Sequence, residues 1–400
     1  MATIINARSP FFVKASNANL ASAYIGIYIY EGAYQLNPTS SDLKYTITKS
    51  EIETNNYVVF EIGELIRDYI DIKYDGEYDS YCVWVRTTVV MYDSTGSPIG
   101  GASNTDYVAT EGYGYFEEGI NPEPSRGLLQ SNLIAYRPED GSINIPIFAE
   151  GTNSLAFYNN GELVRTQTIS DNDNTNQKIQ YIASSGNSDS ATYEERVLED
   201  GGTFEDSVCL QRFLNSIDVG AFDEVWVNYD TGTTFTGSGS VTSTEDTKTA
   251  IIKIKTLECS KYEPIRVTFV NKFGALQDIW FDKKSMEAIQ TKTESYKASV
   301  VDLSNLTYNT NAHQMRTLNL MGNERITLNT GFIDDSYNEV IRQLMLSEQI
   351  WMTRLTDTEE LVLPLKARTQ SVQYKTHIND RLVNYTIEFD MAFDKINNIR

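Results

Sequence analysis

The chain has 400 residues, 40% of them hydrophobic, and a formal net charge of −22 at pH 7. This apolar content excludes a mainly disordered protein, and at roughly 100–200 residues per domain the length predicts two to four domains. So acidic a chain is poorly suited to gripping the phosphate backbone of nucleic acid. With only 2 His and 3 Cys, most zinc sites and most Ser-His-Asp or Cys-His catalytic sites are nearly excluded.

The N-terminal sequence and the cysteines predict a cytoplasmic site of synthesis. The first residues lack a basic segment followed by an apolar core, which predicts no secretory signal. No stretch approaches the ~18–20 apolar residues of a membrane helix. Cys82, Cys209 and Cys259 are far apart and odd in number, so we expect three reduced, buried thiols. A Cys209–Cys259 bridge stays open, because spacing alone does not decide it.

The first segment, residues 1–120, is predicted to be a β-sandwich. Apolar runs at 24–30, 57–62 and 81–90 are separated by polar turns. Short strands at this spacing are typical of immunoglobulin- or fibronectin-like sandwiches. One short helix is expected at 62–70, because its apolar residues fall on one face.

A second, loop-rich β domain is predicted over residues 121–286. It begins with the clearest linker of the chain, 121–127, which holds two prolines and a glycine. Runs of Asp, Asn, Ser and Thr predict long surface loops; they lie at 166–176, 184–192 and 229–247. Four strands are expected in this domain, at 224–229, 250–255, 265–270 and 278–281, the last two joined as a hairpin.

The third segment, residues 287–400, combines strands with one amphipathic helix at about 335–347. Ser336 and Glu339 form a capping-box pattern at the start of this helix. Its apolar stripe consists of Tyr337, Val340, Ile341, Leu344 and Met345. Strand-compatible stretches precede the helix at 296–302 and 325–329, and four strands follow it, at 349–354, 361–366, 369–375 and 382–392. The last strand alternates apolar and polar residues, the period of a half-buried strand.

The negative charge is unevenly distributed among the three segments. Residues 1–120 carry a net charge of −9, residues 121–286 carry −10, and residues 287–400 carry only −3. A domain with both signs of charge is better suited to packing against copies of itself than one with a single-sign field.

No motif for catalysis, cofactor binding or metal binding stands out. His313 and His377 have no ligand-type neighbour three or four residues away, and no Gly-rich phosphate loop is present. Residues 171–174 resemble the start of a calcium loop but lack its later Gly and Glu, and 194–206 is interpreted as an acidic turn. We therefore predict no catalytic, cofactor or metal residues and no enzymatic activity. A glycosidase, which needs only two carboxylates, stays a weak alternative.

The four tryptophans are predicted to anchor cores, because each lies inside an expected strand. They are Trp84, Trp226, Trp280 and Trp351. The alternative is a sugar-stacking platform on an exposed sheet face. Periodicity does not choose the face of Trp226, since Val225 and Val227 flank it.

Five stretches resemble virion tail proteins of crAss-like, Bacteroidota-infecting, short-tailed phages. They are residues 4–13 (IINARSPFFV), 59–69 (VFEIGELIRDY), 112–119 (GYGYFEEG), 267–275 (VTFVNKFGA) and 384–400 (NYTIEFDMAFDKINNIR). The resemblance implies a tail hub or a stacked ring protein, without separating the two. It also implies that the last segment is similar to tail-tube and hub modules, whose sheets close into a ring with their copies. The N-terminal sandwich would be a docking domain, and 393–400 would dock on a neighbour.

Two functional hypotheses follow. The first is a non-enzymatic virion subunit, assembled in the host cytoplasm, that forms a homomeric ring around the DNA ejection channel. Its partners would be copies of itself, neighbouring tail ring, hub or fibre proteins, and passing genomic DNA that an acidic lumen does not bind specifically. The second is a surface adhesin or carbohydrate-binding fibre or baseplate protein, suggested by tandem sandwiches and 25 Tyr.

Overall fold

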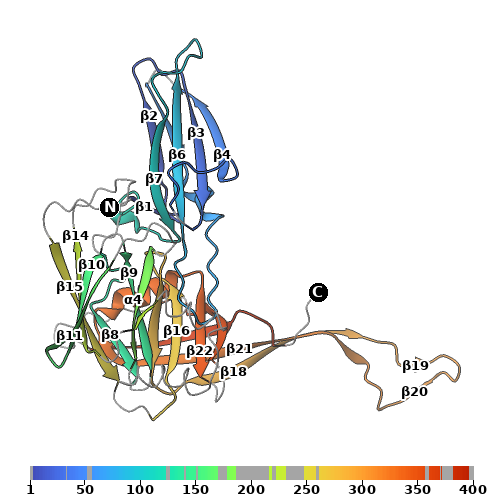
Figure 1. Ribbon diagram of the computed structural model, residues 1–400. Helices are drawn as coiled ribbons and strands as arrows, with labels where there is room; N and C mark the ends of the chain where they lie inside the picture. Colours follow the sequence, from blue (N-terminus) through green and yellow to red (C-terminus); the bar gives the residue numbers. More distant parts are fainter. Residues whose placement is uncertain are drawn as a thin grey trace, which may run out of the picture.

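A computed structural model gives the fold, which is mainly β, as the sequence predicts (Figure 1). The structure describes residues 3–32, 34–51, 56–122, 127–138, 141–149, 152–169, 178–185, 216–218, 222–230, 247–257, 261–355, 360–369, 371 and 382–395. Within these residues, two β-sandwiches and a third sheet covered by a helix make up the molecule, and a long hairpin projects from the third sheet.

The N-terminal unit is a sandwich of a five-stranded and a two-stranded sheet. The larger sheet has the order β1 (Thr3–Asn6), β7 (Ser103–Thr110), β6 (Cys82–Tyr92), β3 (Ser22–Tyr30) and β4 (Leu43–Ser50), and the smaller pairs β2 (Phe12–Ser16) with β5 (Tyr57–Glu61). Apolar residues of both sheets are fully buried between them, among them Ile25, Phe60 and Val85. The expected short helix is α1 (Gly63–Arg67), which closes one end of this core with Ile66; η1 (Phe116–Glu118) follows β7.

The second unit is also a sandwich. A five-stranded sheet has the order β11 (Glu162–Thr168), β10 (Thr152–Asn159), β14 (Glu224–Asp230), β15 (Thr247–Leu257) and β8 (Ile134–Pro138), and a three-stranded sheet has the order β13 (Ser216–Asp218), β12 (Ile179–Ser185) and β9 (Ser142–Phe148). Ile145, Phe157 and Val225 are fully buried in the shared core. Most of the three predicted loop runs lies outside the described residues.

The third unit is a seven-stranded sheet. Its order is β17 (Leu276–Phe281), β16 (Ile265–Val270), β22 (Ile350–Leu355), β23 (Glu360–Ala367), β24 (Leu382–Met391), β21 (Met315–Asp334) and β18 (Met286–Lys297). The hairpin β16–β17 falls in the middle segment of the sequence-based division, yet it belongs to this sheet because β16 pairs with β22. The strand expected at 369–375 lies mostly outside the described residues. We refer to the second sandwich and this sheet, without the projecting hairpin, as the body.

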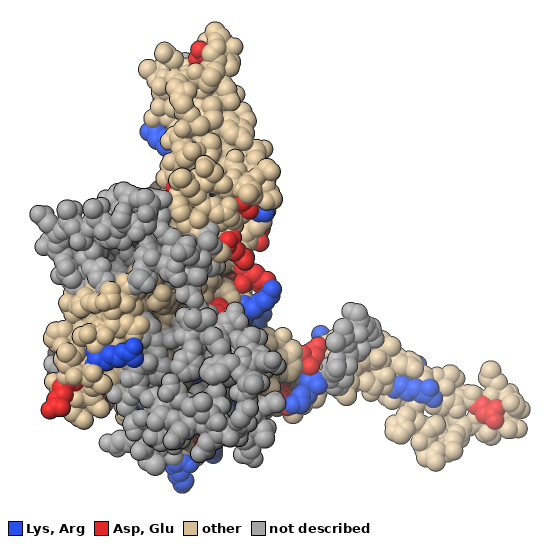
Figure 2. Space-filling view, viewed as in Figure 1, with Lys and Arg blue, Asp and Glu red and all other residues tan. Residues whose placement is uncertain are grey.

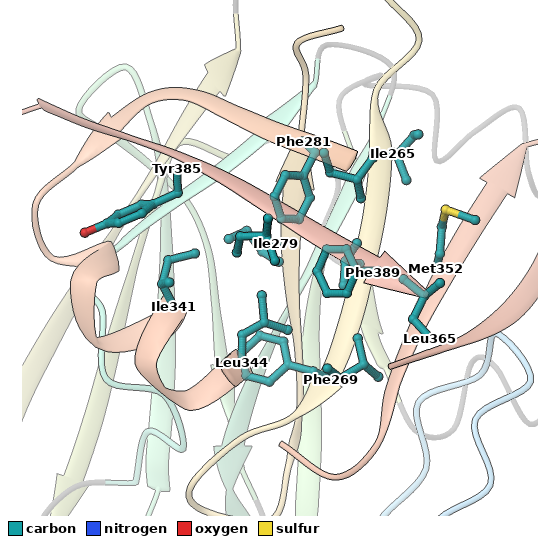
Figure 3. Packing of buried hydrophobic residues seen from close by; sticks show 14 of the residues in the cluster. Ile265, Phe269, Ile279, Phe281, Ile341, Leu344, Met352, Leu365, Tyr385 and Phe389 are labelled. Carbon is teal, nitrogen blue, oxygen red and sulfur yellow. The ribbon is translucent and has the colours of Figure 1, made fainter. Parts of the chain in front are cut away.

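The amphipathic helix α4 (Tyr337–Leu346) covers one face of the seven-stranded sheet (Figure 3). Its predicted apolar stripe is confirmed, because Tyr337, Val340, Ile341 and Leu344 are buried against strand residues such as Phe389. Such burial supplies most of the stability of a short helix.

The predicted capping box at the start of α4 is wrong. The Ser336 hydroxyl makes no capping bond, because the residue has helical dihedral angles. The Ser336 amide instead donates to Asp334 Oδ1 at 3.0 Å. Glu339 points to the N-terminal unit and accepts a hydrogen bond from the Tyr115 hydroxyl at 2.7 Å.

Candidate functional site

The described residues contain no cluster of three or more His, Cys, Asp or Glu side chains that could hold a metal ion. His313 is exposed. Cys82 is buried as predicted, with its sulfur 3.4 Å from the Ser80 hydroxyl. His377, Cys209, Cys259 and the acidic stretches 171–174 and 194–206 lie outside the described residues.

The tryptophans divide between core and sheet surface. Trp84 and Trp280 are buried, as predicted. Trp351 is partly buried, with its ring centroid 5.4 Å from that of Tyr74. Trp226 lies on the sheet face opposite to Val225 and Val227, which occupy the core, and its ring lies 4.9 Å from that of Tyr158. The core-anchor prediction therefore fits Trp84 and Trp280 best.

The most distinctive feature of the molecule is a hairpin arm, residues 286–321, that projects from the seven-stranded sheet (Figure 1). β18 pairs with β21 from Met286, opposite Thr327, to Lys297, opposite Met315. Every residue of β18 is exposed. The short pair β19 (Val301–Asp302) and β20 (Thr307–Tyr308) forms the tip. In the described structure, the part of β21 before Arg325 pairs with β18 alone.

Specific contacts hold the root of the arm to the body. Arg325 donates to Asp390 Oδ1 of β24 at 3.1 Å and to Gln290 Oε1 of β18 at 2.8 Å. Lys395 donates its amide to the Gly322 carbonyl at 2.8 Å and pairs with Glu324 at 3.0 Å. These bonds tie both arm strands to the sheet, so the direction of the arm is set at its root.

The arm surface is apolar and close to neutral. Of the 26 large hydrophobic side chains exposed in the described residues, eleven lie on the arm: Met286, Ile289, Tyr296, Val301, Leu303, Leu306, Tyr308, Met315, Leu318, Leu320 and Met321. Charges of both signs are scattered between them (Figure 2). Exposed apolar surface of this kind marks interaction sites. A lone two-stranded hairpin is marginally stable and leaves two backbone edges open to pairing. The arm therefore has the properties of an assembly surface.

A buried carboxylate, Asp278 of β17, joins the three units. It accepts hydrogen bonds from the Tyr78 hydroxyl at 2.6 Å, from Thr268 Oγ1 at 2.8 Å, and from both the backbone amide and Nδ2 of Asn144 at 3.1 Å. Tyr78 belongs to a segment that descends from the N-terminal unit to the body, and Asn144 belongs to β9 (Figure 1). One side chain thus bonds all three units.

Aromatic rings surround this junction. The ring of Tyr78 lies 5.4 Å from that of Tyr74 and 5.2 Å from that of Tyr181, both in edge or tilted geometry, which is favourable for aromatic pairs. Burial raises the pKa of the Tyr78 phenol well above its ordinary value, so it stays a protonated donor to Asp278. The junction between the units is therefore both packed and hydrogen-bonded.

A second contact between units is an ion-pair network. Arg67 of α1 pairs with Glu111 at 2.8 Å and with Glu348, just after α4, at 2.6 Å, and Arg8 reaches Glu348 at 3.0 Å. Glu111 is largely buried, and this burial raises the pKa of its carboxyl despite the neighbouring Arg67.

The raised pKa of Glu111 gives a pH-dependent prediction. The folded state binds this proton more tightly than the unfolded chain, so the contribution of Glu111 to stability falls as the pH rises above the ordinary value of 4.5. We compare the melting temperature of Glu111→Gln with that of the wild type at each pH. The gain of the variant over the wild type is expected to be larger at pH 7 than at pH 4. Glu348→Gln, which alters the exposed partner of Arg67, is the control; an equal gain there would contradict this prediction.

Gly274, in the turn between β16 and β17, supports a second stability prediction. Its φ is +77°, and a Cβ there would lie 2.7 Å from the backbone nitrogens of Glu111 and Gly112. Gly274→Ala is expected to cost about 2–4 kcal/mol, because backbone strain and a clash add. The control is Gly96→Ala, at φ +81° with no atom within 4 Å of the Cβ, which has the strain alone. Equal losses on denaturant unfolding would contradict this account.

The arm is the feature that sequence reasoning missed. The residues were expected to be strand-compatible, but nothing marked them as unpartnered. A usable signal is present at Leu303 and Leu306, which stand among Asp, Ser and Asn without the alternation of a buried strand.

The described residues include no helix that is both long and apolar enough to span a membrane. No protein-family model and no curated protein matches the chain. A similarity was found to a solved structure from work on the host-cell surface retention of a 1.5-MDa bacterial ice-binding adhesin. It has 9% identity, covers 82% of this chain and 88% of the other, and has a TM-score of 0.16. A likeness of this size supports no conclusion about function.

Proposed function

We propose that this protein is a non-enzymatic structural subunit of a phage virion tail, and that its copies form a ring around the DNA ejection channel. The observation that carries the proposal is the arm, whose apolar residues have no cover in the described part of the chain. A surface like this supports a role in assembly, because obligate interfaces are apolar and become buried only in the complex.

The assignment to a phage tail rests on the sequence resemblance. The matching stretches run from residues 4–13 to residues 384–400 and so span the chain. In this proposal the subunit is a tail hub or a stacked ring protein, and neighbouring tail ring, hub or fibre proteins are its other partners. The particle would be assembled in the host cytoplasm and carried in the virion tail.

The ring proposal is tested on the purified full chain. Light scattering coupled to size exclusion and negative-stain electron microscopy are expected to show ring-shaped particles of several copies. A chain that stays monomeric at high concentration contradicts the ring. A monomer that also binds glycans would favour the adhesin instead.

The channel part of the proposal predicts that the protein does not bind duplex DNA. With a net charge of −22, the chain repels the phosphate backbone, and an acidic lumen would let DNA slide without sticking. Fluorescence anisotropy with a labelled duplex at low salt is expected to show no binding, although low salt favours electrostatic association. Binding with micromolar affinity would contradict the acidic channel.

A further inference from the structure

We propose that the arm of one copy docks on the next copy of the same chain, on the flank of the body that carries edge strand β11. The contact is head-to-tail: each copy gives its arm to one neighbour and receives an arm from the other. This inference deepens the proposed ring function and rests on it, because it names the surfaces that join the copies.

The reach of the arm suits a neighbouring subunit. Strands extend about 3.3 Å per residue, so the twelve paired residues of β18 span roughly 40 Å. This length is about the width of a domain of ~150 residues. The apolar tip residues Leu303 and Leu306, 82% and 81% exposed, are thus placed far from their own body. They are available to a second molecule and not to the chain that carries them.

Charge favours a second copy as the partner. The outer arm, residues 292–317, contains the bases Lys292, Lys297 and Arg316 and the acids Glu294 and Asp302, which gives a net charge of +1. The rest of the chain therefore carries −23. Two such acidic molecules repel each other, whereas the outer arm is attracted to a neighbouring acidic molecule. The outer arm is thus opposite in sign of net charge to the rest of the molecule.

The outer edge of β11, which has no partner among the described strands, is the acceptor that the structure favours. Among the described strands β11 pairs only with β10, and all but one of its residues are exposed. Leu163 and Val164 are adjacent and 54% and 53% exposed, so each face of this edge presents one exposed apolar side chain. An extended segment can add to such an edge through main-chain hydrogen bonds, and the arm has two open edges of its own.

The position of β11 fits a ring. β11 and the arm lie on opposite sides of the body (Figure 1). A donor and an acceptor on opposite flanks make a heterologous contact, which closes into a ring when the rotation between copies allows it. Another edge strand, β4 of the N-terminal unit, carries Lys44 and Lys49. Edge lysines discourage strand pairing. The two lysines of β4 have no acid beside them in that strand and would repel the outer arm, whereas Arg165 of β11 is balanced by Glu162.

The test uses one variant of the full chain for each surface. Leu303→Asp with Leu306→Asp disables the arm tip, and Leu163→Asp with Val164→Asp disables the acceptor edge. The control is Leu36→Asp, at a residue 64% exposed on the N-terminal unit. Circular dichroism and thermal melting establish that each variant is folded; all the changed residues are exposed, so we expect little change in stability.

Mixing the two variants distinguishes a head-to-tail contact from an arm-to-arm contact. Each double variant alone is expected to be monomeric by light scattering, with self-association weakened at least ~100-fold, the loss typical of interface hot spots. The control is expected to assemble like the wild type. A mixture of the two double variants retains one intact arm and one intact acceptor, and is expected to form dimers but nothing larger.

Three results would overturn the inference. If the arm-tip variant assembles like the wild type, the arm does not join the copies, while the ring proposal still stands. If the acceptor variant still self-associates through its intact arm, the acceptor is not β11. If the wild type is monomeric throughout, both the ring and the arm contact fail.

Discussion

Replacing Asp278 with Ala is expected to lower the free energy of unfolding by about 3–5 kcal/mol, among the largest losses from one polar side chain. Asp278 is 2% exposed and accepts four hydrogen bonds, two of them from Asn144. Removing the carboxyl leaves the amide and Nδ2 of Asn144 buried without an acceptor, and buried unsatisfied donors are costly. The Tyr78 and Thr268 hydroxyls can turn to other acceptors, so losing their hydrogen bonds to Asp278 costs less free energy.

Denaturant unfolding followed by tryptophan fluorescence measures this loss, because Trp280 and Trp351 lie in the same sheet as Asp278. Asp278→Asn is a matched variant: it keeps one acceptor oxygen for Tyr78 and Thr268 but turns a donor toward Asn144. We expect it to lose about 2–3 kcal/mol. Asp394→Asn, at an exposed position, is expected to change stability by less than ~0.5 kcal/mol. A small loss for Asp278→Ala would mean that the junction does not hold the units together.

Local sequence patterns were sufficient to predict helix α4 and strand β24. The stripe Tyr337, Val340, Ile341 and Leu344 predicted helix α4, because helical spacing alone places these residues on one face. The alternation in 382–392 predicted β24 for the same kind of reason, and the alternating residues Val383, Tyr385, Ile387 and Phe389 are buried. These elements carry their signal within a dozen residues.

Strand pairing and hydrogen bonds between distant segments could not be predicted from local patterns. β16 is buried along its whole length, so its pattern does not indicate which strand lies beside it. The hydrogen bonds of Asp278 join it to Tyr78 and Asn144, which are 200 and 134 residues away. No local spacing encodes a bond between such distant residues.

The arm illustrates the same limit for a functional surface. Whether a strand is covered depends on where its neighbour ends. β24 ends at Met391, and β21 extends beyond it toward Met315 with β18 as its partner. The sequence of 315–324 is as compatible with a buried strand as with an exposed one. Only the three-dimensional arrangement shows that its apolar residues are left for another molecule.

The core that anchors the arm provides the last prediction. Phe389 of β24 is fully buried, lies opposite Ile326 of β21 in register, and packs edge-on against Phe281, with ring centroids 6.2 Å apart (Figure 3). Phe389→Ala is expected to cost about 3–5 kcal/mol, because it removes the ring from a closely packed site and leaves a cavity. Phe393→Ala is the matched control: this ring lies four residues later and is 38% exposed, so we expect a loss below ~1 kcal/mol.

The position of Phe389 also ties this core to the arm. Ile326 follows the root residue Arg325 directly in β21, so loosening Phe389 should loosen the root as well. Hydrogen exchange is expected to be faster in Phe389→Ala for the β21 amides near Ile326, while the core of the N-terminal sandwich around Phe60 keeps its protection. Equal stability losses for the two phenylalanine variants, or unchanged hydrogen exchange at the root, would mean that the α4-covered core does not fix the direction of the arm.

Ring assembly gives a second measurement. If the core does anchor the arm, assembly of Phe389→Ala is expected to weaken; if it does not, assembly should be unaffected by this change.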